Sequence, residues 1–276
     1  MDMRFSTGAI VCLFLSVKLF AQTGDYGTGA RAMAVGFTAG TFSDEWAGFN
    51  NIGAVAGGSR DPAVAFSCQS LYGIKGLVKK AAAINLPYKT FAGTVNFFRF
   101  GDEYFSESRI GLGFGHKIRF VSLGASINYL QWSMEYCGSR GIFYVDAGGL
   151  AELFPGFWVG AWMQNINQAR ISEISRTKFP VTLDLSLSYR PEDFLLVNME
   201  IVKTDASGTR VKAGAEYGIH NKLFLRTGIM LNPVRNFFGF GLKPRRFIID
   251  YAFSFQNYLG CCHALSLGIL LNRKHD

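Results

Sequence analysis

The chain has 276 residues, of which 49% are hydrophobic and only 17% are charged, and its formal net charge is +8 at pH 7. A soluble domain has about 25% charged residues, so the composition disfavours an ordinary soluble protein. Beyond the N-terminal stretch no apolar run reaches the about 18 residues that a transmembrane helix needs. The positive charge comes without a basic run or recognition motif, so we expect no nucleic-acid partner.

Residues 1–21 have the pattern of a secretory signal peptide. Arg4 supplies a positive charge, residues 10–20 form a short apolar stretch, and Ala21 is the small residue that a cleavage site requires. The apolar stretch is too short and too poorly flanked for a spanning helix. Export across the inner membrane is therefore expected, and together with the strands described below it predicts the cell outer membrane.

Residues 22–62 precede the first predicted strand and are rich in Gly and Ala. The run at 27–31 is only superficially like a phosphate loop, because no strand precedes it and no Lys-Ser/Thr ending follows. Glycines permit tight turns and close backbone approach in a narrow space. A compact segment of this kind at the mouth of a barrel is typical of a plug, with four candidate plug residues: Arg31, Trp46, Asn50 and Gly53.

Apolar and polar residues alternate along residues 179–189, which predicts a strand with one apolar and one wet face. The pattern recurs without a helical segment to cover the apolar face, which indicates lipid outside and an enclosed lumen inside. The predicted fold is an all-β, 14-stranded antiparallel transmembrane β-barrel over 63–272 with an N-terminal plug segment. The predicted strands are 63–72, 79–86, 91–100, 108–117, 120–132, 141–153, 157–167, 179–190, 194–203, 209–219, 223–231, 236–243, 246–255 and 263–271.

Charged residues fall at the inward positions of several predicted strands. A three-residue turn at 220–222 would place Glu216 opposite Arg226 as an ion pair. A similar turn after Arg190 would place Asp184 opposite Glu200, which requires a basic neighbour such as Arg31 or a raised pKa. Two interpretations are open. These residues either fill the lumen as a structural network that contacts the plug, or they line a polar path or gate. The lumen-facing network comprises Asp184, Glu200, Lys212, Glu216, Arg226 and Asp250.

The remaining residue types suggest no chemistry. The four histidines have no nucleophile arrangement beside them and the cysteines have no metal-ligand spacing, so we expect a non-enzyme without metal or cofactor. Cys137, Cys261 and Cys262 fall in predicted loops, and their disulfide pairing is left open. Aromatic residues near strand ends are interpreted as interface girdles: Trp132, Tyr136, Phe143, Tyr144, Trp158, Trp162, Phe194 and Tyr258.

Two stretches of the plug segment resemble a known family. The runs G-A-R-A-M-A-V-G-F-T-A at 29–39 and S-D-E-W-A-G-F-N-N-I-G at 43–53 are similar to the N-terminal segment of PorV/PorQ and FadL-like outer-membrane barrels of Bacteroidota. That family carries an Asn-Pro-Ala-Gly box. Asn50 and Gly53 match its first and last residues, whereas Asn51 occurs where the family has Pro and Ile52 where it has Ala. The later runs G-A-E-Y, F-G-F-G-L and I-D-Y-A-F resemble its C-terminal strands.

The resemblance implies two functions. The first is a non-enzymatic barrel of the PorV/PorQ type that binds secretion-system or surface proteins in type IX secretion, besides outer-membrane lipid. The alternative is a FadL-like transporter of small hydrophobic molecules. Short loops of about ten residues and an inward set of mostly Gly, Ser, Asn and charged residues favour the first. An inward aromatic cluster, or a kink with a side opening in the first three strands, would favour the alternative.

Overall fold

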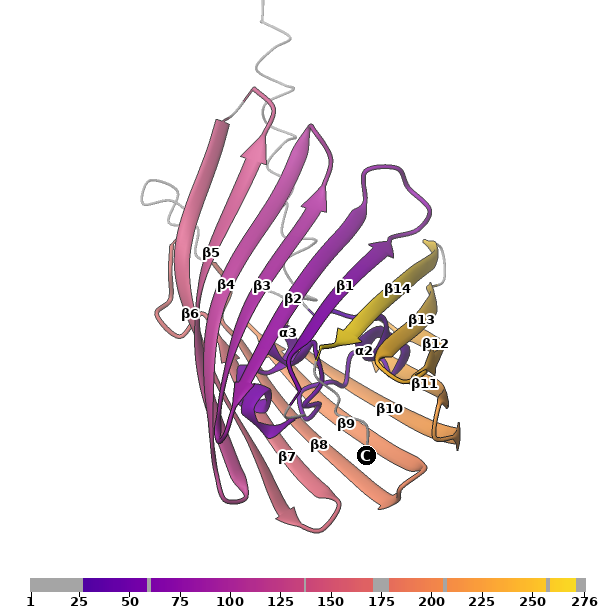
Figure 1. Ribbon diagram of the computed structural model, residues 1–276. Coiled ribbons are helices and arrows are strands. Elements are labelled where there is room, and N and C mark those ends of the chain that lie inside the picture. Colours follow the sequence, from indigo (N-terminus) through magenta and orange to yellow (C-terminus); the bar gives the residue numbers. More distant parts are fainter. Residues whose placement is uncertain are drawn as a thin grey trace, which may run out of the picture.

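The computed structural model describes residues 27–58, 61–136, 138–170, 179–205, 208–256 and 259–271. The predicted signal peptide, Cys137 and Tyr258 lie outside these residues. Within them, fourteen antiparallel strands form a single closed barrel (Figure 1). Each strand pairs with its neighbours in the sequence, and β1 closes the barrel against β14.

The fourteen strands predicted from the alternation are confirmed, with every end within three residues of the prediction. Strand bounds are β1 Ala63–Ser70, β2 Val78–Tyr88, β3 Phe91–Gly101, β4 Phe105–Ile118, β5 Val121–Met134, β6 Gly138–Phe154, β7 Phe157–Gln164, β8 Thr182–Glu192, β9 Leu195–Thr204, β10 Gly208–His220, β11 Leu223–Leu231, β12 Arg235–Leu242, β13 Phe247–Gln256 and β14 Gly260–Leu270.

The outer surface of the barrel is apolar and its interior carries the polar side chains. Along β8, Leu183, Leu185 and Leu187 are 40%, 50% and 43% exposed, whereas Asp184 and Ser186 between them are buried. A soluble sheet would bury its leucines, but a barrel in lipid turns them outward. The same arrangement recurs from strand to strand, so the sheet is a transmembrane barrel.

The two ends of the barrel differ in the length of their connections. One end, here called the turn end, has short turns such as 119–120 and 221–222. The other, here called the loop end, carries the longer segments, including 71–77 and 165–181. The expected limit of about ten residues for the loops is wrong for 165–181, of which 171–178 lie outside the described residues. Longer loops mark the extracellular end of such barrels.

Residues 27–58, here called the plug, lie inside the barrel (Figure 1). They form two short helices, α2 Ala30–Ala34 and α3 Ala47–Asn50, and the 3-10 helix η1 Ile52–Gly57. Their apolar side chains, such as those of Met33 and Phe49, are buried against inward-facing residues of the strands. None of the described helices has the length and apolar character needed to cross a membrane.

Candidate functional site

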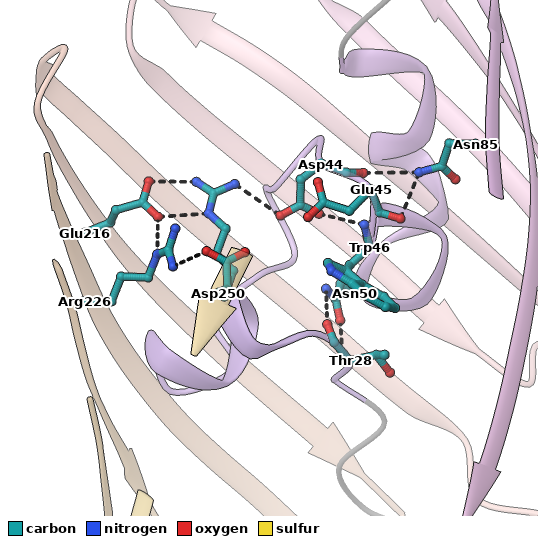
Figure 2. A network of polar contacts seen from close by, with 10 residues as sticks. Thr28, Asp44, Glu45, Trp46, Asn50, Asn85, Glu216, Arg226 and Asp250 are labelled. Atoms are coloured by element: carbon teal, nitrogen blue, oxygen red, sulfur yellow. Dashed lines mark hydrogen bonds and ion pairs between the residues drawn. The ribbon is translucent and has the colours of Figure 1, made fainter. Parts of the chain in front are cut away.

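The plug is attached to the barrel wall by an ion network centred on Arg31. Its other members, labelled in Figure 2, are Asp44, Glu216, Arg226 and Asp250. Its Nε and Nη2 donate to Oε2 and Oε1 of Glu216 at 2.9 and 2.8 Å, and its Nη1 lies 3.1 Å from Oδ2 of Asp44. Arg226 donates to the same Glu216 and to Asp250, at 2.6 Å in each case. The expected pair of Glu216 and Arg226 is present, and a plug residue joins it.

Two carboxylates and an aromatic ring keep Arg31 charged. Burial by itself would lower the pKa of Arg31, but the carboxylates of Glu216 and Asp44 raise it above its usual range. The guanidinium also lies 4.2 Å from the centre of the Phe42 ring. Arg31 therefore stays charged in the interior, and its carboxylate partners compensate the cost of burying it.

A second ion pair holds the next part of the plug. Lys212 lies 3.2 Å from Oε1 of Glu200 and donates to the Phe37 carbonyl at 3.3 Å. Oε2 of Glu200 accepts hydrogen bonds from the Gly40 backbone N–H and from the Ser186 hydroxyl. Glu200, like Glu216, thus has both a cation and a plug group as partners.

The expected register of β8 and β9 is wrong. Ser186, not Asp184, lies opposite Glu200, and Asp184 lies opposite Val202. The turn is tighter than expected, and an irregularity lies between Tyr189 and Glu192; together they move the pairing by two residues from the expected register. Asp184 instead lines a small crevice with Trp162 and other inward residues, apart from the Arg31 network.

Two other predicted plug residues, Asn50 and Trp46, make contacts within the plug. Asn50 accepts a hydrogen bond from the Thr28 N–H at 2.9 Å and donates to the Thr28 carbonyl at 3.1 Å (Figure 2). Trp46 is 1% exposed, and its indole packs so closely on Gly29 that a Cβ there would lie 2.7 Å from Trp46 Cδ1. The Asn85 side chain of β2 donates to the Glu45 carbonyl at 2.9 Å and connects this part to the wall.

The two positions that depart from the Asn-Pro-Ala-Gly box contact the wall directly. Asn51 donates to the carbonyls of Gly40 and Gly149, at 2.6 and 3.1 Å, and its side-chain oxygen caps the Gly53 N–H. Ile52 packs where a Cβ at Gly113 would meet its side chain. Sequence reasoning missed both contacts, because it treated these positions only as losses from the family pattern.

Inward glycines give the plug backbone its room. A Cβ at Gly160 of β7 would lie 2.5 Å from the Gly40 carbonyl oxygen, and one at Gly239 of β12 would lie 2.6 Å from Ala34 Cβ. Gly53 itself lies against the backbone of β6, so its own Cβ would collide there. Small residues therefore occur on both sides of the contact, in the plug and in the wall.

Toward the loop end, the lumen contains buried aromatic side chains next to buried polar and charged ones. Phe98 and Phe100 of β3 are 7% and 4% exposed and pack with plug residues. Leu130 and Tyr144 form a further buried cluster with Phe179, whose ring centre lies 4.8 Å from that of Tyr144. The expected inward set of mostly Gly, Ser, Asn and charged residues did not include these aromatic side chains. Parity along the strands could have shown it, because Tyr144 is in phase with the inward Asp146.

Arg109 of β4 lies among these aromatic side chains. Its guanidinium carbon lies 5.0 and 5.5 Å from the ring centres of Phe49 and Phe98, and its Nη1 donates to the Tyr144 hydroxyl at 3.1 Å. Such rings stabilise a cation through their faces. Arg109 was not among the predicted site residues, although its inward phase on β4 was readable.

The turn-end side of the plug has a different character. A cavity of about 370 Å³ is lined by apolar residues and by charged ones, which include Arg31, Glu45 and Lys243. Burial, with Asp44 and Asp250 nearby, raises the pKa of Glu45 to about 8. Burial and the positive Arg31 lower the pKa of Lys243. Packed aromatic side chains therefore lie on the loop-end side of the plug, and a cavity with charged residues in its lining lies on the turn-end side.

Other expectations can be placed on the structure. Tyr144 and Trp162 point inward and are not part of an interface girdle. Cys261 and Cys262 lie in β14 rather than in a loop, and the thiols of both, like that of Cys68, are free. Across the ranges described above, no group of His, Cys, Asp and Glu could hold a metal ion.

The pairing of the first three strands is continuous. β1 with β2 and β2 with β3 pair residue by residue without a register shift. The shifts recorded for the described strands lie near the turn end, between Glu152 and Phe154 for example. The kink that would have favoured a side opening in β1 to β3 therefore finds no counterpart in these two ladders.

No protein-family model and no curated protein matches the chain. Solved structures do match the chain. A protein described as the CymD monoaromatic hydrocarbon channel is 12% identical with a TM-score of 0.71, over 90% of this chain and 99% of that chain. The Pseudomonas putida toluene transporter TodX is 11% identical with a TM-score of 0.67, over 88% and 96%.

A Pseudomonas aeruginosa FadL homologue is 13% identical with a TM-score of 0.66, covering 89% of this chain and 98% of that chain. At such low identities the likeness is one of fold. The chain has the fold of the FadL-like barrels along nearly the whole length of these structures.

Proposed function

We propose that this protein is an outer-membrane channel for small hydrophobic molecules, closed by its plug. The observation that carries the proposal is the set of inward aromatic side chains toward the loop end, with Phe98 and Phe100 in one buried cluster and Tyr144 in another. Binding sites for apolar ligands are lined by hydrophobic and aromatic side chains with a few polar groups. The solved structures of similar fold include proteins described as a monoaromatic hydrocarbon channel and a toluene transporter.

In this proposal the lumen-facing charges hold the plug and do not line a water path. Glu216 and Glu200 each bind a plug group, and Arg226 and Lys212 compensate their charge. A molecule that enters at the loop end meets the plug below these aromatic side chains. Passage to the turn end therefore requires the plug to move. The ion networks keep the plug in its closed position until it does.

Uptake by intact cells tests this function. The protein is expressed in the outer membrane of a host that lacks hydrophobic-molecule channels, and uptake of radiolabelled toluene is compared with that of radiolabelled glucose. We expect faster toluene uptake than in host cells with an empty vector, and unchanged glucose uptake. Equal toluene uptake in both cells would contradict the proposal, and faster uptake of both solutes would indicate an unselective pore.

Partner binding in type IX secretion stays a prediction. The inward aromatic side chains and the long segment 165–181 weaken two of the reasons for preferring it. Two of the structures reported above are described as a hydrocarbon channel and a toluene transporter, and none of the three is described by secretion. We therefore place the transport function first. Purification in detergent followed by mass spectrometry would reverse this order if secretion-system proteins, and no hydrophobic small molecules, copurified.

A further inference from the structure

Two cations lie side by side on the outer surface of the barrel. Lys80 of β2 and Arg99 of β3 are direct partners in the strand register, and both side chains are exposed. They lie close to the loop end, since β2 begins at Val78 and β3 ends at Gly101. Within the described part of the chain, neither side chain has a hydrogen-bond or ion-pair partner.

The registers of β2 to β5 place these cations at a boundary between polar and apolar residues. The outward residues at their level, here called the polar row, are Lys80, Arg99, Ser108 and Gln131. The next outward residues toward the turn end, here called the apolar row, are Ala82, Phe97, Ile110 and Tyr129. Such a change marks the level at which lipid acyl chains give way to headgroups.

Two like charges directly opposite each other in a sheet are destabilising. A single cation at the edge of the lipid region can extend its side chain toward water, and Lys203 of β9 is such a residue, with Leu183 and Thr209 opposite it. The pair of Lys80 and Arg99 differs because each cation has the other as its neighbour. An anionic group between them would attract both cations and offset their mutual repulsion.

We propose that Lys80 and Arg99 bind the phosphate groups of a phosphorylated lipid in the leaflet at the loop end. An arginine fork matches two phosphate oxygens, and a lysine adds a point charge. Ser108 and Gln131 continue the polar row and can donate hydrogen bonds to the same headgroup. The acyl chains lie along the apolar row. The site follows from the transmembrane fold and does not depend on what the lumen carries.

The test uses the full-length protein in detergent micelles and diphosphoryl lipid A as the probe. Bound lipid is counted by native mass spectrometry across a lipid titration. We expect the Lys80→Gln/Arg99→Gln double variant to bind about tenfold more weakly than wild type, which corresponds to about 1.4 kcal/mol. The control Lys203→Gln removes an outward cation without a cationic neighbour, and we expect its binding to match that of wild type.

Two further arms identify the source of the recognition. A lipid A without phosphate groups is expected to bind wild type and the double variant equally, and inorganic phosphate alone is expected not to compete at millimolar concentration. Wild-type affinity in the double variant, or an equal loss in Lys203→Gln, would overturn the proposal. So would full competition by inorganic phosphate. Should the double variant fail to fold, the single variants Lys80→Gln and Arg99→Gln provide the same comparison.

Discussion

Arg31 of the plug and Glu216 of β10 are joined by two parallel hydrogen bonds, at 2.9 and 2.8 Å, inside the barrel. Glu216 also accepts from Arg226, so one carboxylate lies between two arginines. Removing one partner of a buried ion pair leaves an uncompensated charge, which costs more than the pair itself contributes. Substitution of Glu216 is therefore expected to weaken the attachment of the plug to the wall.

Glu216→Gln is expected to destabilise the folded protein by about 3–5 kcal/mol, because Arg31 and Arg226 lose their shared carboxylate. Thermal unfolding in micelles measures the stability of the variant. Conductance in a planar bilayer shows whether the plug still closes the lumen. We expect a lower midpoint and larger or noisier currents. Glu192→Gln, at an exposed position, is the control. Unchanged midpoint and conductance in Glu216→Gln would show that this network does not hold the plug.

Gly160→Ala is expected to displace the plug, because its Cβ would lie 2.5 Å from the Gly40 carbonyl oxygen. Overpacking of this kind costs about 1–3 kcal/mol. Gly93→Ala is the matched control on β3, where the nearest atom lies 4.0 Å from the added Cβ. Limited proteolysis from the turn end should cut the plug faster in Gly160→Ala only. Equal cleavage of both variants would contradict the close packing of plug and wall.

Glu45 is expected to make the protein less stable as the pH rises. Its folded pKa of about 8 lies above the ordinary value of 4.5. Between these values the folded state holds the proton more tightly than the unfolded chain, so the free energy of unfolding decreases by up to about 1.4 kcal/mol for each unit of pH. Glu45→Gln should raise the unfolding midpoint at pH 9 and change it little at pH 4. An equal change of midpoint at both pH values would refute this.

Phe98→Asn is expected to reduce uptake of a hydrophobic probe about tenfold, because an unpartnered amide in an apolar site costs roughly 1–3 kcal/mol. Phe98→Leu keeps the site apolar and should retain most of the uptake. The two variants are compared by their rates of radiolabelled toluene uptake in cells with equal surface expression. A similar loss in both variants would indicate that the ring matters for folding, whereas no loss in either would remove Phe98 from the path.

Side-chain alternation could be read directly from the chain. It predicted fourteen strands and the inward positions of Lys212, Glu216 and Arg226, because a period of two in a closed barrel assigns each residue to lipid or lumen. The same parity would have placed Tyr144 and Trp162 inside. They were assigned to an interface because aromatic residues near predicted strand ends were given more weight than their phase.

The sequence by itself determined the barrel, since alternation is a local property of each strand and needs no partner to be visible. Only the tertiary structure decided which inward residues meet. A tighter turn moved Ser186 opposite Glu200, and the path of the plug brought Arg31 to Glu216 rather than to Asp184. These contacts join residues far apart in the chain. Their geometry depends on the closure of the whole sheet around the plug, which no local pattern records.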